Sequence, residues 1–185
     1  MMKERRPKLQ VEFGPINENN LQQLRKLNLA IFPVKYNDKF YSDILFVPEN
    51  FAQYAYVNGF VVGAICARIE ESEGGSLKAY IMTLGVLAAY RGRGIGHLLL
   101  KRLMEAVEEH GGLEEVYLHM QTSNADALRF YERHGFDNID TIRNYYKRIE
   151  PPDCYILKKR LSTNGNLLNN VELEIKKEES EDEAS

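Results

Sequence analysis

Apolar residues alternate with polar ones in some segments and recur at helical spacing in others. The alternation over residues 9–13 predicts a short strand, and leucines three residues apart predict a helix from Leu21 to Ile31. Asn17 is a candidate N-cap for this helix. The helix should end before Phe32-Pro33, because the residue ahead of a proline avoids the helical region. A short second helix is expected over 38–46.

The middle of the chain is typical of antiparallel strands. Phe51–Val57 and Phe60–Glu70 are rich in β-branched and aromatic residues. The intervening Asn58-Gly59 predicts a tight hairpin, since both residues tolerate positive φ. After a polar turn, Leu77–Leu87 predicts a third strand that leads into a glycine-rich turn at 90–96.

The second half of the chain alternates helices and strands. A helix, a strand, a helix and two strands are expected in turn at Ile95–His110, Glu115–Met120, Asn124–His134, Phe136–Ile142 and Cys154–Leu161. Together with the first half, this order predicts one mixed α/β (α+β) domain over residues 9–161. The remainder, 162–185, is polar and acidic, and we expect it to be a disordered tail because it can bury too little surface to offset its ordering entropy.

Composition and charge narrow the function classes. A hydrophobic content of 44% over 185 residues is typical of a soluble globular protein with one core. A formal net charge of -3 gives no global attraction to nucleic acids or acidic membranes. The basic start of the chain is not followed by an apolar signal segment, so we expect a cytoplasmic protein, to which a nuclear pool could be added. Cys66 and Cys154 lie in strand-like runs and are expected to be reduced, with no metal bound.

The most specific motif is Arg91-Gly92-Arg93-Gly94-Ile95-Gly96, between a predicted strand and a predicted helix. Glycines there let backbone N–H groups turn toward an anion, and a helix N-terminus adds unpaired donors. The motif lacks the Gly-Lys-Ser/Thr ending of a loop that binds nucleoside triphosphates. It is also not followed by the acidic residue that binds the ribose in a dinucleotide-binding fold. A diphosphate cradle is therefore expected, with a plain tight turn as the alternative.

Two linked motifs resemble the GNAT superfamily of acetyl-CoA-dependent N-acetyltransferases. Arg-x-x-Gly-x-Gly after the fourth strand is similar to its acetyl-CoA motif, and Asn124–Tyr131 resembles the helix that follows. Further segments resemble NatE-type catalytic subunits, namely Phe32-Pro33-Val34, Tyr36–Lys39, Tyr80–Gly85, Tyr117–His119 and Asn144–Lys147. The resemblance runs from about Val11 to Leu161. It implies a mostly antiparallel twisted sheet flanked by helices, with acetyl-CoA as co-substrate.

The resemblance also assigns residues to the coenzyme. Backbone groups of Leu84, Gly85 and Val86 would meet the pantetheine arm, and a backbone N–H there would hold the oxyanion. The diphosphate would lie on Arg91, Gly92, Arg93, Gly94, Ile95, Gly96 and His97. Asn124, Ala127, Phe130 and Tyr131 would line the other side, with Tyr131 placed to protonate the leaving thiolate.

Tyr80 and His119 are the candidate catalytic residues. Strand alternation places Tyr80, Met82 and Leu84 on one face and Tyr117 and His119 on one face of the neighbouring strand, so the pair can converge. Together they would hold a water that takes the proton of the attacking amine. On residue type alone, a histidine at a strand end is more often a hydrogen-bonded structural residue.

By resemblance, two loops form a slot for a peptide N-terminus. The pocket for a first methionine would comprise Phe32, Pro33, Val34, Met82, Tyr146 and Ile149. The peptide backbone would meet Tyr36, Tyr145, Lys147 and Arg148. The implied reaction is acetyl transfer, in a ternary complex, to the α-amine of protein N-termini that begin with methionine and an apolar residue.

Two other functions remain open at this point. One is acetylation of lysines or polyamines. The other is an accessory subunit that binds acetyl-CoA and assists a NatA-type scaffold and catalytic subunit at the ribosome; the presence of both Tyr80 and His119 argues against pure scaffolding. The chain departs from its relatives at Ala89, at Lys35 and around Pro48, and Lys35 bears on the finer peptide preference.

Overall fold

The computed structural model describes residues 9–162, which form one seven-stranded sheet with helices on both faces. Its strands are β1 (Glu12–Pro15), β2 (Ala52–Val57), β3 (Phe60–Glu71), β4 (Leu77–Val86), β5 (Leu113–Gln121), β6 (Asp137–Ile142) and β7 (Cys154–Arg160). Its helices are α1 (Leu21–Ile31), α2 (Asp38–Ile44), the short 3₁₀ turn η1 (Ala88–Tyr90), α3 (Ile95–His110) and α4 (Ala125–Arg133). Every predicted element is present, and the ends differ by a few residues.

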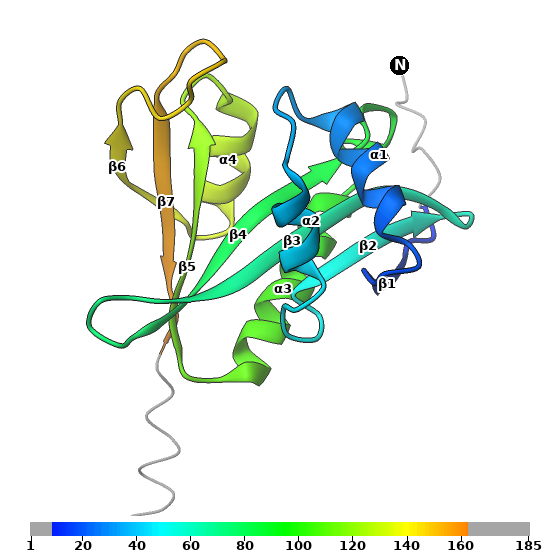
Figure 1. Ribbon diagram of the computed structural model, residues 1–185, viewed down its shortest axis with the longest axis horizontal. Coiled ribbons are helices and arrows are strands. Elements are labelled where there is room, and N and C mark those ends of the chain that lie inside the picture. Colours follow the sequence, from blue (N-terminus) through cyan, green and yellow to red (C-terminus); the bar gives the residue numbers. More distant parts are fainter. Residues whose placement is uncertain (1–8, 163–185) are drawn as a thin grey trace, which may run out of the picture.

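The strands lie in the order β1-β2-β3-β4-β5-β7-β6 (Figure 1). Neighbouring strands are antiparallel except for β4 and β5, which are parallel. The connection between these two strands carries α3, as a parallel crossover requires. The predicted mixed, mostly antiparallel sheet is confirmed.

The sheet opens between β4 and β5. The two strands pair only over Leu77–Tyr80 and Leu113–Tyr117, although both continue for several residues beyond. Past this point β4 remains paired with β3 and β5 with β7. The two halves of the sheet therefore diverge as a V, with α4 beside one arm and α1 and α2 beside the other (Figure 1).

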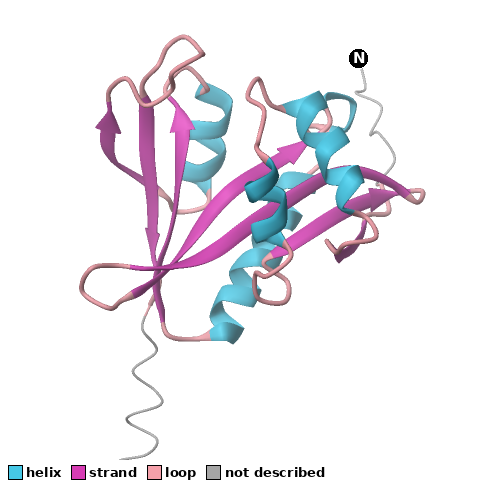
Figure 2. Ribbon diagram, viewed as in Figure 1, coloured by secondary structure: helices cyan, strands magenta, loops and turns pink. Residues whose placement is uncertain are grey.

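Two hydrophobic clusters hold the helices to the sheet. Figure 2 shows the helices packed against the strands. The larger one joins α3 and α4 to one face through the buried Leu99, Leu103, Tyr131 and Phe136. The other joins α1 and α2 to the opposite face, where Leu24 and Ile44 pack on Tyr54 and Cys66. The chain thus forms a sheet with helices on both sides and an opening in its middle.

The turn and helix-cap residues act as the sequence predicts, with one exception. Asn58 and Gly59 both have positive φ in the β2–β3 turn. Asn37 caps α2 by accepting a hydrogen bond from the Phe40 N–H at 2.9 Å. The prediction that Asn17 caps the first helix is wrong. The N-cap is Asn20, and its side chain turns back to accept from the Asn17 N–H at 2.9 Å, which closes the turn before the helix.

A β-bulge in β4 corrects a second prediction. Cys66 and Ala67 of β3 face Thr83 and Ile81 of β4, so Met82 is an extra residue with no partner of its own. The bulge reverses the alternation. Tyr80 and Met82 still share a face as expected, and Met82 packs into the α1–α2 cluster, whereas Leu84 pairs with Ile65 and packs into the cluster on the α3 face. Leu84 therefore does not share a face with Tyr80.

The expected acidic tail lies, from residue 163 onward, outside the described part of the chain, and its disorder stays a prediction. Within residues 9–162, none of the helices combines the length and the apolar character needed to cross a bilayer.

Candidate functional site

A cavity of about 180 Å³ lies where β4 and β5 separate. One wall is apolar and comes from the α1–α2 loop and the β6–β7 loop; the other comes from β4, β5 and α4. Its lining residues are Phe32, Pro33, Val34, Tyr36, Ile81, Met82, Thr83, Leu84, Leu118, His119, Met120, Gln121, Asn124, Ala127, Tyr131, Tyr146 and Ile149. Of the residues predicted for the coenzyme, Leu84, Asn124, Ala127 and Tyr131 thus share one space with residues predicted for the peptide. Gly85, Val86 and residues 91–97 are not part of this lining.

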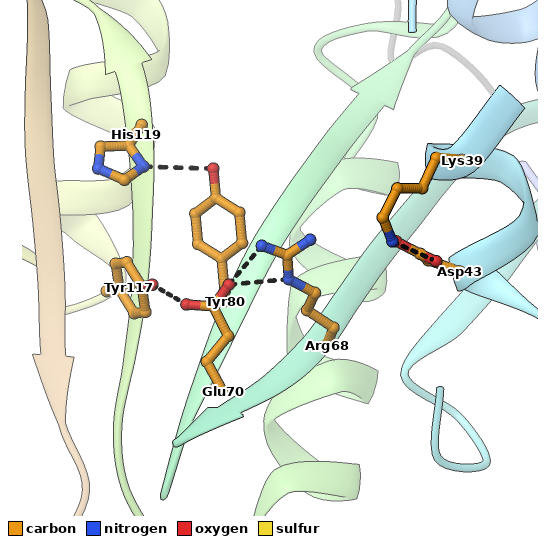
Figure 3. Close-up of polar contacts among 7 residues, drawn as sticks. All are labelled: Lys39, Asp43, Arg68, Glu70, Tyr80, Tyr117 and His119. Carbon is orange, nitrogen blue, oxygen red and sulfur yellow. Dashed lines mark hydrogen bonds and ion pairs between the residues drawn. The ribbon is translucent and has the colours of Figure 1, made fainter. Parts of the chain in front are cut away.

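Tyr80 and His119 meet where the two strands begin to separate (Figure 3). The Tyr80 hydroxyl lies 3.2 Å from Nδ1 of His119. Tyr80 pairs in register with Tyr117, two residues before His119, so the parallel segment of β4 and β5 fixes this approach. The structure brings the two candidate catalytic residues together as predicted, while their roles stay predictions.

Burial sets the protonation of this pair. It raises the pKa of Tyr80 well above its usual range, so the phenol keeps its proton near neutral pH. Burial lowers the pKa of His119 below its ordinary value of about 6.5, and the nearby Glu70 carboxylate partly opposes this change. His119 is therefore neutral at pH 7 and can accept a proton.

A charged network beside Tyr80 was not predicted from the sequence (Figure 3). The Tyr117 hydroxyl donates to Glu70, and Nε of Arg68 donates to the same carboxylate at 2.8 Å. Burial would raise the pKa of Glu70, but these hydrogen bonds outweigh it and the pKa lies below the usual range. The Arg68 guanidinium also lies 5.3 Å from the centre of the Tyr80 ring. The one signal in the sequence is that Arg68 and Glu70 are two residues apart on a strand, and so on one face.

The six residues predicted to form a methionine pocket lie together, while their role stays a prediction. All six of its residues line the cavity, and Tyr36 joins them through ring contacts with Phe32 and Phe40. The β6–β7 loop is held by a 2.8 Å hydrogen bond from the Tyr146 N–H to the Pro152 carbonyl. Three of the residues predicted to contact the backbone of the peptide substrate do not line the cavity. Tyr145 stacks on His119 with ring centroids 4.9 Å apart, and Lys147 and Arg148 are exposed.

The glycine-rich loop has the backbone of an anion cradle. Gly92 and Gly94 have φ of 73° and 82°, which a side chain would strain. Helix α3 then begins at Ile95 with no side-chain cap, so the N–H groups of its first turn are free to bind a ligand. Nε of Arg91 donates to the Val86 carbonyl at 2.9 Å and ties the loop to the end of β4. The loop is thus fixed beside the cavity, and these residues fit a coenzyme diphosphate.

Helix α4 forms the other side of this groove. Asn124 caps it by accepting from the Ala127 N–H at 3.1 Å, and Asn124, Ala127 and Tyr131 line the cavity. Phe130 does not line it. Its ring would lie 3.6 Å from a Cβ placed on Gly96, so Phe130 packs helix to helix, and glycine permits the close approach.

Metal and cysteine chemistry find no support in the described residues. No group of three or more metal-binding side chains occurs between residues 9 and 162. Cys66 and Cys154 are buried and unpaired. Burial raises the pKa of the Cys66 thiol to about 12, so it is not a thiolate nucleophile at neutral pH.

Comparison with known proteins agrees with this geometry. Residues 21–136 match the acetyltransferase (GNAT) family. N-alpha-acetyltransferase 50 of Danio rerio is 48% identical over 151 residues, which cover 82% of this chain and 89% of the relative. The probable N-acetyltransferase san of Drosophila melanogaster is 46% identical over the same length, with 82% and 81% covered.

Solved structures show the same fold. Arabidopsis thaliana Naa50, in complex with the bisubstrate analogue CoA-Ac-MVNAL, has a TM-score of 0.76 and 48% identity, with 82% of this chain and 99% of that chain covered. Arabidopsis thaliana NAA60 in complex with acetyl-CoA has a TM-score of 0.72 and 25% identity, covering 82% of this chain and all of its own. The chain therefore belongs to the GNAT acetyltransferase family, and within it to the group of Naa50 and San N-alpha-acetyltransferases.

Proposed function

We propose that this protein transfers the acetyl group of acetyl-CoA to the α-amine of protein N-termini that begin with methionine and an apolar residue. The observation that carries this proposal is the Tyr80–His119 pair, whose histidine lines the same cavity as the apolar pocket. The relative that binds a CoA–peptide analogue beginning with methionine supports the same assignment.

The proton of the amine can leave through the pair. If the Tyr80 hydroxyl donates to Nδ1 of His119, its oxygen is free to accept a proton from the amine, directly or through one water. As the Tyr80 oxygen receives that proton, its own proton passes to the neutral His119. The amine nitrogen forms a bond to the acetyl carbon, and the carbon–sulfur bond breaks. Tyr80 is regenerated, and His119 carries the proton until solvent removes it.

The chain also supplies groups for the thioester. The bulge at Met82 interrupts the pairing of β4 with β3 at the cavity wall, beside Thr83 and Leu84. A backbone N–H directed at the carbonyl oxygen contributes a few kcal/mol in such sites, about 3 to 4 for a single donor. Burial raises the pKa of Tyr131, so its phenol is protonated and can donate to the leaving thiolate.

The choice of amine follows from protonation and shape. Near neutral pH roughly one α-amine in ten is unprotonated, compared with about one lysine side chain in a thousand. A modest base is therefore enough to activate an α-amine. The apolar walls suit a methionine side chain, whose burial contributes about 1.5 to 3 kcal/mol. We expect the two loops that line the cavity to close it to a lysine presented from the side of a folded segment.

We propose further that the protein works in the cytoplasm, with a nuclear pool, on nascent or completed chains, and that it can associate with a NatA-type scaffold and catalytic subunit at the ribosome. Its two unpaired, buried thiols suit a reducing compartment. Co-sedimentation with ribosomes in the presence and absence of such a scaffold tests this assignment. If the protein stays in the ribosome-free fraction when the scaffold is present, the proposed association is contradicted.

A peptide panel tests the reaction itself. Purified protein and acetyl-CoA are incubated with Met-Leu, Ala-Leu and Ser-Leu peptides, each with a free and a formylated N-terminus. We expect turnover of the free Met-Leu peptide, little of the others, and none after formylation. If formylated peptides that contain lysine are turned over as fast as the same peptides with a free N-terminus, the result would favour the hypothesis of a lysine acetyltransferase.

A further inference from the structure

A second, smaller cavity lies against the loop between α1 and α2. Its volume is about 130 Å³, and side chains of α1, the loop and α2 form its walls. Val34 and Tyr36 line both this cavity and the larger one. The two cavities therefore share a wall, and that wall belongs to the loop that contributes to the predicted methionine pocket.

The lining of the smaller cavity is positively charged. Arg25 of α1 and Lys35 of the loop both belong to it, and none of its lining residues is acidic. Asp38 balances Arg25, with 2.8 Å between its carboxylate oxygen and the guanidinium. Lys35 makes no ion pair with any residue between 9 and 162. The cavity thus has one cation available to an anion from outside the chain.

Two buried polar side chains, Asn28 and Tyr41, also line this cavity. The Asn28 amide donates to the Tyr41 hydroxyl at 3.4 Å, and neither side chain makes another hydrogen bond within the described residues. An amide carries two N–H groups and a phenol one O–H group, so each has a hydrogen left to donate. The Arg25 guanidinium lies 4.0 Å from the centre of the Tyr41 ring, which fixes its position. This set of donors suits a carboxylate, which only accepts hydrogen bonds.

The size and place of the smaller cavity indicate its occupant. Pockets for drug-sized ligands have volumes of roughly 300 Å³ or more, so this one suits a single side chain. A peptide whose first residue lies in the larger cavity must pass the wall that the two cavities share. An extended chain advances about 3.3 Å per residue and directs successive side chains to opposite sides. One of the residues shortly after the second can therefore direct its side chain past Val34 and Tyr36 into the smaller cavity.

We propose that the smaller cavity binds the carboxylate of an acidic residue at position three, four or five of the peptide substrate, and that Lys35 sets this preference. The carboxylate pairs with Lys35 and accepts hydrogen bonds from Asn28 and Tyr41. A lysine at the same position of the peptide would instead meet the like charges of Lys35 and Arg25. This inference rests on the proposed function, since it assumes that the first residue of the peptide occupies the larger cavity.

Steady-state kinetics of the full chain with a series of Met-Leu peptides measures the preference. Alanine occupies positions three to five, and glutamate, glutamine or lysine replaces each alanine in turn. At one position we expect the KM of the glutamate peptide to lie about two- to fivefold below that of the matched glutamine peptide, as is typical of an exposed ion pair. The lysine peptide should have the highest KM. The kcat values should agree, because neither Tyr80 nor His119 lines the smaller cavity, and added salt should reduce the difference in KM.

Variants that change one charge separate the roles. Lys35→Gln should abolish the difference in KM between the matched glutamate and glutamine peptides, and Lys35→Glu should reverse the preference in favour of the lysine peptide. Asp38→Asn leaves Arg25 without its acidic partner and should lower the KM of the glutamate peptide further. Lys26→Gln is the matched control, because Lys26 is an exposed neighbour on α1 that lines neither cavity, and it should keep the preference of the unmodified protein.

The peptide series distinguishes failure of this inference from failure of the proposed function. Turnover with equal KM for matched glutamate and glutamine peptides at all three positions overturns the inference and leaves the proposed function intact. A preference for glutamate that persists in Lys35→Gln also overturns it, because the carboxylate then binds elsewhere, such as at the exposed Lys147 or Arg148. Absence of turnover with every Met-Leu peptide overturns the proposed function as well.

Discussion

His119 lies in surroundings that keep it neutral. Burial lowers its pKa, and the carboxylate of Glu70 limits the change. Because its protonated form cannot act as a base, we expect the acid limb of the kcat profile to lie below about pH 6.5. Tyr80→Phe and His119→Ala should each reduce kcat by roughly a hundredfold or more.

This first prediction is checked by steady-state kinetics with a Met-Leu peptide, with coenzyme affinity as the control for folding. Variants that bind coenzyme normally and retain full kcat would remove the acid–base assignment from this pair.

Glu70 provides a second prediction at the residue scale. Glu70→Gln removes the one carboxylate that raises the pKa of His119 and leaves Arg68 without its partner. The His119 pKa should fall further, which moves the acid limb of the kcat profile to lower pH by about one unit or less. Glu71→Gln, an exposed neighbour on the same strand, is the matched control. An unchanged profile in Glu70→Gln would show that Glu70 does not act on His119.

At the scale of elements, the hairpin at Asn58-Gly59 and the helix from Ile95 to His110 could be predicted because their signals are local. The bulge at Met82 could not, since no residue type marks it and it depends on the pairing of β3 with β4. It moved Leu84 to the opposite face from the one expected. The network of Glu70 and Tyr117 joins strands far apart in the chain, and only the assembled sheet reveals it.

Gly85 provides a prediction about how β4 meets α1. A Cβ at Gly85 would lie 2.9 Å from side-chain carbons of Ile31 and Phe32. Gly85→Ala should therefore displace the end of α1, lower the unfolding free energy by about 1 to 3 kcal/mol and raise KM for the peptide, because Phe32 lines its pocket. Chemical denaturation and peptide kinetics measure the two effects.

Gly74→Ala is the control for this change, because the nearest atom to a Cβ there is 4.0 Å away in an exposed turn. Equal stability of the two alanine variants would contradict a tight contact between β4 and α1.

At the scale of the whole molecule, Glu115 joins the two halves of the sheet below the opening. Its carboxylate accepts from Nζ of Lys78 on β4 at 2.9 Å and of Lys158 on β7 at 2.8 Å. Burial would raise the pKa of Glu115, but these two lysines outweigh it and the pKa lies below the usual range. A lowered folded-state pKa means that Glu115 stabilises the fold above its unfolded pKa of about 4.3, and that this contribution is lost as the pH falls through the folded value.

Glu115→Gln should therefore lower the unfolding free energy at pH 7 by about 1 to 3 kcal/mol, and the difference from the unmodified protein should shrink below about pH 4. Urea denaturation at a series of pH values measures this. Glu114→Gln, the exposed neighbour, should change stability little. A difference that is constant from pH 7 to pH 3 would exclude the ionised carboxylate as its source.

The order of elements over residues 9–162 was predictable, because most of them have their own hydrophobic period. The point at which the sheet opens was not, since it depends on β5 pairing with β7 and leaving β4. Resemblance to a family therefore indicated the candidate site residues in the sequence, and the divergence of the strands explains why the apolar pocket lies beside the Tyr80–His119 pair.

The position of the acetyl group in the product shows which amine the protein acetylates. A Met-Leu peptide with a single internal lysine offers both amines to the protein in one reaction with acetyl-CoA, and tandem mass spectrometry locates the acetyl group. We expect the first acetyl group on the α-amine of methionine, with the lysine left free. A product acetylated first on the lysine side chain would contradict it.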